Sequence, residues 1–239
     1  MNNFSINVIY EDNHLIVVNK KSGDIVQGDK TGDLPLSDEV KTYIKAKYNK
    51  PGKVYLGTVH RLDRPTSGIV LFAKTSKALS RMNKKFKDKD IQKTYWAVVE
   101  KPKNINKFPL QNTLIDFLKK NEKQNKSYCF KQEINGAKKS ELSYKVIGKG
   151  DNYWFVEIKP KTGRHHQIRV QLSNIGLIIK GDLKYGAKRS NKDGSIHLLA
   201  RQLDFIHPVK KQPITIKANP PKDTLWDEFL KQSEKKERS

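Results

Sequence analysis

The chain of 239 residues contains little cysteine and few acidic residues, and it has no long apolar run. Its one cysteine, Cys129, excludes an internal disulfide framework and a zinc cluster built on cysteine. No stretch approaches the roughly 18 consecutive apolar residues of a membrane span, and the N-terminus lacks a signal-peptide core. These absences predict a cytoplasmic protein with no membrane contact.

The charge that is present is mainly positive: 48 Lys and Arg stand against 25 Asp and Glu, a formal net charge of +23. This excess favours a polyanionic partner, nucleic acid first, because basic side chains that neutralise phosphates release counterions. The alternative is a lysine-rich surface that only keeps the protein soluble. With 40 lysines and 8 arginines, each arginine is expected to mark a need for the planar guanidinium fork.

Hydrophobic periodicity predicts both strands and helices. Strands and hairpins are expected over residues 7–19, 68–73, 94–99 and 142–158. Helices are expected from Ser37 and Thr75, which are suitable N-caps, after Gly163, and over 223–231. This order favours an α+β fold with a mixed, mainly antiparallel sheet and flanking helices.

The chain shows no linker between domains. We expect one catalytic domain over residues 1–230, followed by a charged, disordered tail over 231–239. Residues 101–139 indicate edge strands and loops.

Asp63 lies between Arg61 and Arg64, just before an apolar strand. Nearby positive charge favours the ionised carboxylate and lowers its pKa. Such an aspartate suits a nucleophile, a weak base or a stabiliser of positive charge better than a general acid. On spacing alone, a structural aspartate that caps a turn is favoured.

The histidines give little support for a metal site. No acidic residue lies near the His165-His166 pair, and adjacent histidines on the expected helix would point to different faces. A two-metal nuclease needs several converging carboxylates, which are scattered here. Glycine fingerprints for ATP or NAD are absent.

Tyr95 and Trp96 are neighbours on an expected strand, so they should face opposite sides of the sheet. Trp96 is expected in the core. Tyr95 is either a second core aromatic or a platform on which a base can stack.

The segment from His60 to Lys74 (HRLDRPTSGIVLFAK) resembles the signature of the RluA-type RNA pseudouridine synthases. Further motifs of that family follow in order: Lys93-Thr94-Tyr95, Thr162–Arg169, Gly181-Asp182 with Tyr185-Gly186, and His197 with Phe205, His207 and Pro208. Residues 10–20 also fit, so the resemblance covers most of residues 6–210.

The resemblance implies the pseudouridine synthase fold with a central catalytic cleft. It implies isomerisation of specific uridines in rRNA or tRNA, without cofactor or metal. By the same resemblance Asp63 is the essential carboxylate, Arg164 pairs with it, and Tyr95 stacks on the target base. Two roles for Asp63 stay open: addition to the ribose C1′, or removal of a proton from C2′.

RNA-binding roles are expected for five further residues, namely His60, Arg61, Arg64, Ile168 and Arg169. The target base must leave its stack before it can react. Arg61 is expected to fill the vacated space, since a guanidinium can stack like a base, and Ile168 to wall the base pocket. The expected partner is RNA, with no DNA, and the expected state is a monomer.

Two departures from the family pattern stand out. Lys21 replaces a common proline, and His166 makes a second histidine in the third motif, with no role assigned. The aspartate motif begins at residue 60, so we expect a stand-alone catalytic domain without the S4-type domain of many relatives. Rival hypotheses are an RNA-binding module of the same fold and a metal-dependent nuclease.

The charge excess generates a prediction. If lysines form the phosphate-binding surface, RNA affinity will fall steeply with salt, and the slope of log affinity against log salt will reflect several phosphate contacts. Filter binding over a series of KCl concentrations measures this slope. A flat response would show that the lysines do not contact phosphates.

Overall fold

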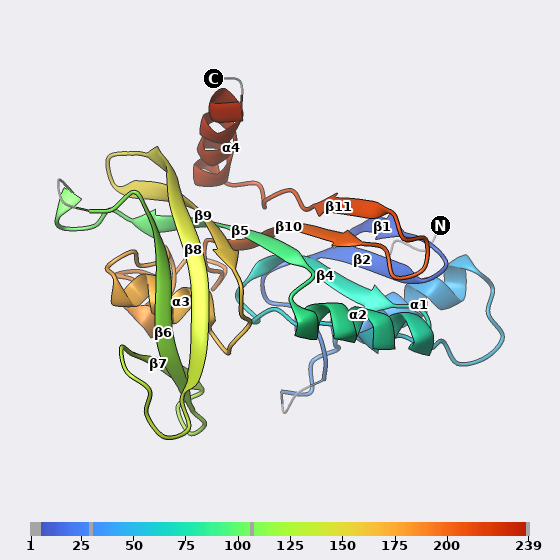
Figure 1. Ribbon diagram of the computed structural model, residues 1–239. Coiled ribbons are helices and arrows are strands. Elements are labelled where there is room, and N and C mark those ends of the chain that lie inside the picture. Colours follow the sequence, from blue (N-terminus) through green and yellow to red (C-terminus); the bar gives the residue numbers. More distant parts are fainter. Residues whose placement is uncertain (1–5, 29–30, 106–107, 238–239) are drawn as a thin grey trace. The chain divides into compact units, whose positions relative to one another are not determined.

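The computed structural model describes residues 6–28, 31–105 and 108–237. The chain divides into two compact units (Figure 1). The first is formed by Met1–Gln92 and Ala200–Pro220, and the second by Lys93–Leu199 and Pro221–Ser239. The single catalytic domain expected over residues 1–230 therefore stays a prediction.

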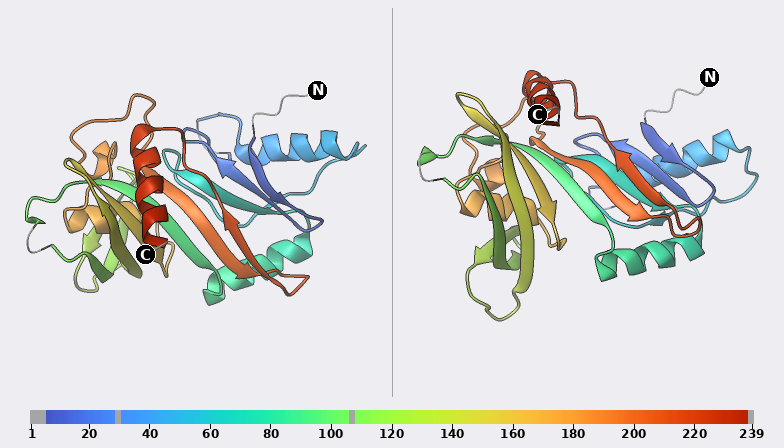
Figure 2. Two further views of the ribbon diagram at one scale, coloured as in Figure 1. Left: turned by 90° about the horizontal axis from the view of Figure 1, so that it is seen from above. Right: turned by 45° about the horizontal axis from the view of Figure 1, so that its top comes forward.

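The first unit combines short strands with two helices. Its strands are β1 (Val8–Glu11), β2 (Leu15–Lys20), β3 (Gly57–Thr58), β4 (Ser67–Ala73), most of β10 (Leu198–Ile206) and β11 (Pro213–Lys217). They lie in the order β1-β2-β4-β10-β11, with β3 paired to β4. Figure 2 shows β10 and β11 as neighbouring arrows, and their pairing is antiparallel. The predicted hairpin over 7–19 is confirmed, since β1 and β2 pair antiparallel.

Helix α1 (Leu36–Lys47) covers one face of this sheet. Every residue of β4 is buried, as expected for a continuous apolar run in the middle of a sheet. Helix, strands and the preceding loop share one core, formed by Ile16, Val18, Val26, Leu36, Val40, Ile44, Val70 and Phe72. Helix α2 (Ser76–Asp88) begins as predicted, with the Thr75 hydroxyl accepting from the Ala78 amide.

The N-cap prediction for Ser37 is wrong. Pro35 occupies the N-cap position, without a side-chain hydrogen bond, and Ser37 is buried inside the first turn. The backbone amides of Leu36 and Ser37 donate instead to the carbonyls of Ile25 and Val26. Backbone carbonyls of the neighbouring loop thus satisfy the amides that a capping side chain would otherwise bind.

The second unit is built on an antiparallel sheet in the order β5-β9-β8-β6-β7. Its strands are β5 (Gln92–Glu100), β6 (Gln111–Asn121), β7 (Lys126–Phe130), β8 (Lys138–Lys149) and β9 (Tyr153–Pro160). The expectation for residues 101–139 is only partly right, because β6 pairs on both sides, with β7 and β8. The α+β prediction with a mainly antiparallel sheet is confirmed.

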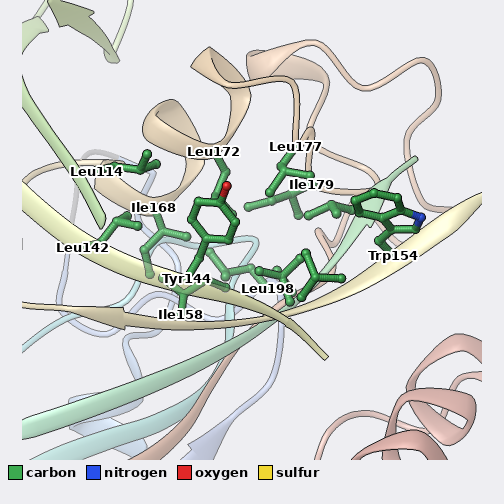
Figure 3. Close-up of a cluster of buried hydrophobic side chains, with 14 of the residues drawn as sticks. Leu114, Leu142, Tyr144, Trp154, Ile158, Ile168, Leu172, Leu177, Ile179 and Leu198 are labelled. Atoms are coloured by element: carbon green, nitrogen blue, oxygen red, sulfur yellow. The ribbon is translucent and has the colours of Figure 1, made fainter. Parts of the chain in front are cut away.

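Both faces of this second sheet are covered. Helix α3 (Gln167–Asn174) packs on one face, where the Tyr144 ring lies among Ile158, Ile168 and Leu172 (Figure 3). The short 3-10 helix η2 (Leu183–Tyr185) follows. Helix α4 (Thr224–Glu237) packs Trp226 and Phe229 on the other face. It extends beyond the predicted 223–231 into the segment expected to be a disordered tail.

Gly68 on β4 generates a stability prediction. Its φ is +113°, and a Cβ there would lie 2.6 Å from the backbone nitrogen of Ala200 on β10. Gly68→Ala is expected to lower the free energy of unfolding by more than about 2 kcal/mol, because backbone must move and an unfavourable φ is kept. Urea unfolding followed by circular dichroism measures it.

Gly52→Ala is the matched control, since nothing lies within 4 Å of its added Cβ. This substitution should leave stability unchanged or raise it by about 0.5 kcal/mol. Equal effects of the two substitutions would contradict the steric argument.

Candidate active site

The Asp63 loop, residues 59–66, joins β3 to β4. Asp63 is half-buried, and its carbonyl accepts from the Thr66 amide at 3.0 Å, which closes a tight turn. The segment after β2 ties the loop down: the Gly23 amide donates to the Arg64 carbonyl at 2.9 Å, and the Ser22 hydroxyl to that of Pro65 at 3.1 Å.

Lys20, at the end of β2, lies directly behind this loop. Its side chain is 1% exposed. The ammonium donates to three carbonyls, those of Lys21 at 2.8 Å, Arg64 at 3.0 Å and Thr66 at 2.8 Å. Burial lowers its pKa to about 8, while the charges of Asp24 and Asp63 act in the opposite direction. Lys20 therefore supports the Asp63 loop from inside the unit.

His60 secures the start of the same loop. Its Nε2 accepts from the Leu71 amide of β4 at 3.2 Å, and its ring stacks on Phe86 of α2 with centroids 5.2 Å apart. These contacts give His60 a structural role. Its predicted RNA contact is not tested by them.

The two arginines of the loop differ. The exposed Arg64 donates from Nε to the Gly23 carbonyl at 3.0 Å and forms an ion pair with Asp33. Arg61 is exposed, and its side chain has no hydrogen-bond or ion-pair partner within the described part of the chain. Of these two guanidinium groups, that of Arg61 is open to an incoming partner.

Tyr95 and Ile168 contribute to the same cluster in the second unit. Tyr95 lies on β5 opposite Ile158 of β9, and its half-buried side chain packs against the core that contains Ile168. Trp96 packs on the other face against Phe229, with ring centroids 4.5 Å apart. The prediction that Tyr95 and Trp96 face opposite sides is confirmed.

Arg164 lies in a turn between β9 and α3, which we call the Arg164 turn, residues 162–166. The buried Gln167 side chain closes this turn: its Oε1 accepts from the Arg164 amide at 3.0 Å and from the Thr162 hydroxyl at 2.7 Å. Its Nε2 donates to the Glu141 carbonyl at 3.1 Å. The Arg164 side chain is exposed, and Nε donates to the Lys139 carbonyl at 3.2 Å.

Arg169, for which RNA binding is predicted, is paired inside the second unit. It forms a bidentate ion pair with Asp182, Nε to Oδ2 at 2.7 Å and Nη2 to Oδ1 at 2.8 Å. Their side chains are 5% and 2% exposed. A guanidinium enclosed in this way cannot reach a phosphate without breaking a buried pair. We therefore assign Arg169 to the support of α3.

The paired histidines also differ from expectation. They precede α3 instead of lying on it, and their rings stack with centroids 3.7 Å apart instead of pointing to different faces. His166 is the N-cap residue with φ +52°. Its buried Nδ1 lies 2.9 Å from the Tyr185 hydroxyl. Burial lowers the pKa of His166 to about 2, so the ring is neutral near neutral pH.

Cys129 on β7 is half-buried, next to the buried Asp116. Burial and this carboxylate raise the pKa of the thiol to about 12. The thiolate that a nucleophile requires is thus scarce at neutral pH. Within the described ranges, no group of three or more His, Cys, Asp or Glu side chains could hold a metal ion. None of the described helices has the length and apolarity that a bilayer crossing needs.

The predicted site residues fall in both units. His60, Arg61, Asp63 and Arg64 belong to the first, and Tyr95, Arg164, Ile168 and Arg169 to the second. Sequence reasoning missed Lys20 and Gln167 as supports of the two loops. A lysine that ends an otherwise apolar strand was the available signal for Lys20.

His166 generates a pH prediction. The unfolded chain takes up a proton on this ring near pH 6.5, while the folded chain resists it down to about pH 2. The unfolding free energy should therefore fall as pH drops below 6.5, with a contribution of up to about 1.4 kcal/mol per pH unit. Urea unfolding at pH 5, 6 and 7 should give a flatter profile for His166→Asn. Parallel profiles of the two proteins would contradict this.

A family model described as RNA pseudouridylate synthase matches residues 14–174, which include all eight predicted site residues. A tRNA pseudouridine synthase C of Pectobacterium carotovorum is 31% identical over 93% of this chain and 59% of its own length. A ribosomal large subunit pseudouridine synthase C of Vibrio vulnificus is 34% identical over 88% of this chain and 64% of its own. The chain thus spans about 60% of the length of these two relatives.

The fold also matches a solved structure. The human RNA pseudouridylate synthase domain containing 4 superposes with a TM-score of 0.75 and 24% identity, over 95% of this chain and 92% of that one. The match supports the fold alone. The family model, which matches more than half of the chain, confirms the resemblance: the chain belongs to the RNA pseudouridylate synthase family, among the RluA-type enzymes.

Proposed function

We propose that this protein is an RNA pseudouridine synthase that isomerises specific uridines in rRNA or tRNA. The observation that carries the proposal is the order Asp63, Tyr95 and Arg164 within the matched residues 14–174. The relatives named above act, by their names, on tRNA and on large-subunit ribosomal RNA. The net charge of +23 suits either RNA.

The reaction rearranges one nucleoside without oxidation or reduction. The bond between the ribose C1′ and N1 breaks, the uracil turns, and C1′ bonds to C5. C5 then loses its proton and N1 carries one. In this proposal Asp63 is the carboxylate that starts the reaction, by addition to C1′ or by proton removal at C2′. Both routes need an ionised Asp63, and Arg164 is proposed as its cationic partner.

Other side chains hold the substrate. Tyr95 stacks on the base and assists removal of the C5 proton, while Ile168 walls the pocket. The exposed Arg61 fills the gap in the RNA stack. The supports described above are Lys20 behind the Asp63 loop and Gln167 directly after the Arg164 turn. They favour such roles because groups that react must be held in a fixed geometry. A cytoplasmic monomer without cofactor stays a prediction.

Pseudouridine mapping tests the proposal. Total RNA from a strain of the source organism that lacks the gene is incubated with the protein, and pseudouridines are mapped. Wild type should add one or a few sites, and Asp63→Asn should add none, because an amide neither attacks C1′ nor takes up a proton.

Asp88→Asn is the matched control, since that carboxylate is exposed on α2 and pairs with Lys84. It should give the wild-type map. If wild type and Asp63→Asn give the same map, Asp63 is not the essential carboxylate. If both bind RNA and neither adds pseudouridine, the RNA-binding module is the better hypothesis.

A further inference from the structure

Four polar residues of the second unit lie close together, and the proposed chemistry does not use them. Ser127 comes from the edge strand β7, His165 and His166 follow Arg164, and Tyr185 ends η2. Ser127, His166 and Tyr185 are all buried. We call these three the Ser127–Tyr185 cluster. A buried polar cluster of this kind is costly unless its members satisfy one another.

The cluster ties both residues after Arg164 to fixed elements. The Tyr185 hydroxyl oxygen accepts from the Ser127 amide at 2.9 Å and lies 2.9 Å from Nδ1 of His166. The Ser127 hydroxyl donates to the His165 carbonyl at 2.7 Å. The chain direction just after Arg164 is therefore set by β7 and η2.

The backbone at this point needs such support. His166 has φ +52°, a left-handed conformation that non-glycine residues adopt only where the surroundings impose it. Before Arg164, the Gln167 side chain holds Thr162 and the Arg164 amide. Arg164 thus lies between two anchors, of which the Ser127–Tyr185 cluster is the second.

Tyr185 is itself held rigidly. The guanidinium carbon of Arg169 lies over the Tyr185 ring, 5.1 Å from its centroid. Arg169 is paired in turn with Asp182, the residue directly before η2. The Ser173 hydroxyl of α3 donates to the Tyr185 carbonyl at 2.7 Å. The Tyr185 hydroxyl that His166 contacts is thus held in place at both the ring and the backbone of Tyr185.

We propose that Ser127, His166 and Tyr185 are positioning residues: they fix the backbone of the Arg164 turn and so direct the Arg164 guanidinium for isomerisation. The inference rests on the proposed function. It assigns no contact with RNA to the cluster. Both rings of the doubled histidine meet the cluster, because Nδ1 of His165 lies 2.9 Å from the Ser127 hydroxyl and Nδ1 of His166 lies 2.9 Å from that of Tyr185.

Tyr185→Phe is the main test, because it removes only the shared hydroxyl. The single-turnover rate of pseudouridine formation should fall about 10-fold to 100-fold, as expected when a reacting group is displaced by about 1 Å. Affinity for the same total RNA, measured by filter binding, should stay within about twofold of wild type. Ser127→Ala should act in the same direction.

Tyr144→Phe is the matched control. Tyr144 is also buried in the second unit, and its hydroxyl donates to the Pro109 carbonyl at 3.0 Å, which is not part of the Arg164 turn. It should leave the rate unchanged. Equal losses in Tyr144→Phe and Tyr185→Phe would indicate a general cost of a lost buried hydroxyl and would overturn the inference.

The effect of Tyr185→Phe is also measured in a protein that already carries Arg164→Lys. If Tyr185 acts through Arg164, then Tyr185→Phe will cost far less in Arg164→Lys than in wild type. The same fold-loss in both backgrounds would overturn the inference. If wild type is active and Tyr185→Phe forms pseudouridine at the same rate, the inference is overturned while the proposed function stands. A wild type that forms no pseudouridine would overturn the proposed function and this inference with it.

Discussion

The Asp63 loop depends on one buried ammonium group. Lys20 donates to three backbone carbonyls, two of which belong to the loop itself. Carbonyl dipoles that converge on a charge compensate part of its lost hydration, while the low dielectric of the interior strengthens each contact. A buried charge therefore holds this loop from inside the unit, while Arg61 on the loop is exposed.

The second unit uses the same device with a different cation. Arg169 is a buried residue of α3 that pairs with Asp182, and its guanidinium packs against the Tyr185 ring. Among the described residues, each unit thus buries a cationic side chain with polar partners: Lys20 in the first and Arg169 in the second. For the lysines that make up most of the positive charge we propose another purpose, the collection of RNA, since charge that collects a polyanion has to be exposed.

The sequence predicts the regular parts of the fold well and the loops poorly. Alternation reveals the hairpins and β4 because burial of one face or both is a local pattern. Ser37 fails as an N-cap because the carbonyls of Ile25 and Val26, about ten residues earlier in the chain, accept from the first helical amides instead. The rarity of arginine predicts a use of the planar guanidinium, and Arg169 shows it in its bidentate pair with Asp182; for Arg61 and Arg164 such a use stays a prediction. The rarity of arginine does not tell an arginine that binds RNA from one in a buried ion pair. For Arg169 the answer depends on the position of Asp182 in the folded chain, which the sequence pattern does not give. Lys20 and Gln167 were missed for the same reason.

Cys129 has a practical consequence. Its thiol is half-buried and its pKa is raised to about 12, so thiol reagents at neutral pH meet little thiolate on this protein. A cysteine introduced at an exposed position would react much faster than the native one. Dyes or spin labels can therefore be attached at chosen positions in each unit without replacing Cys129. Distances between such labels would report directly how the two units are arranged when RNA is bound.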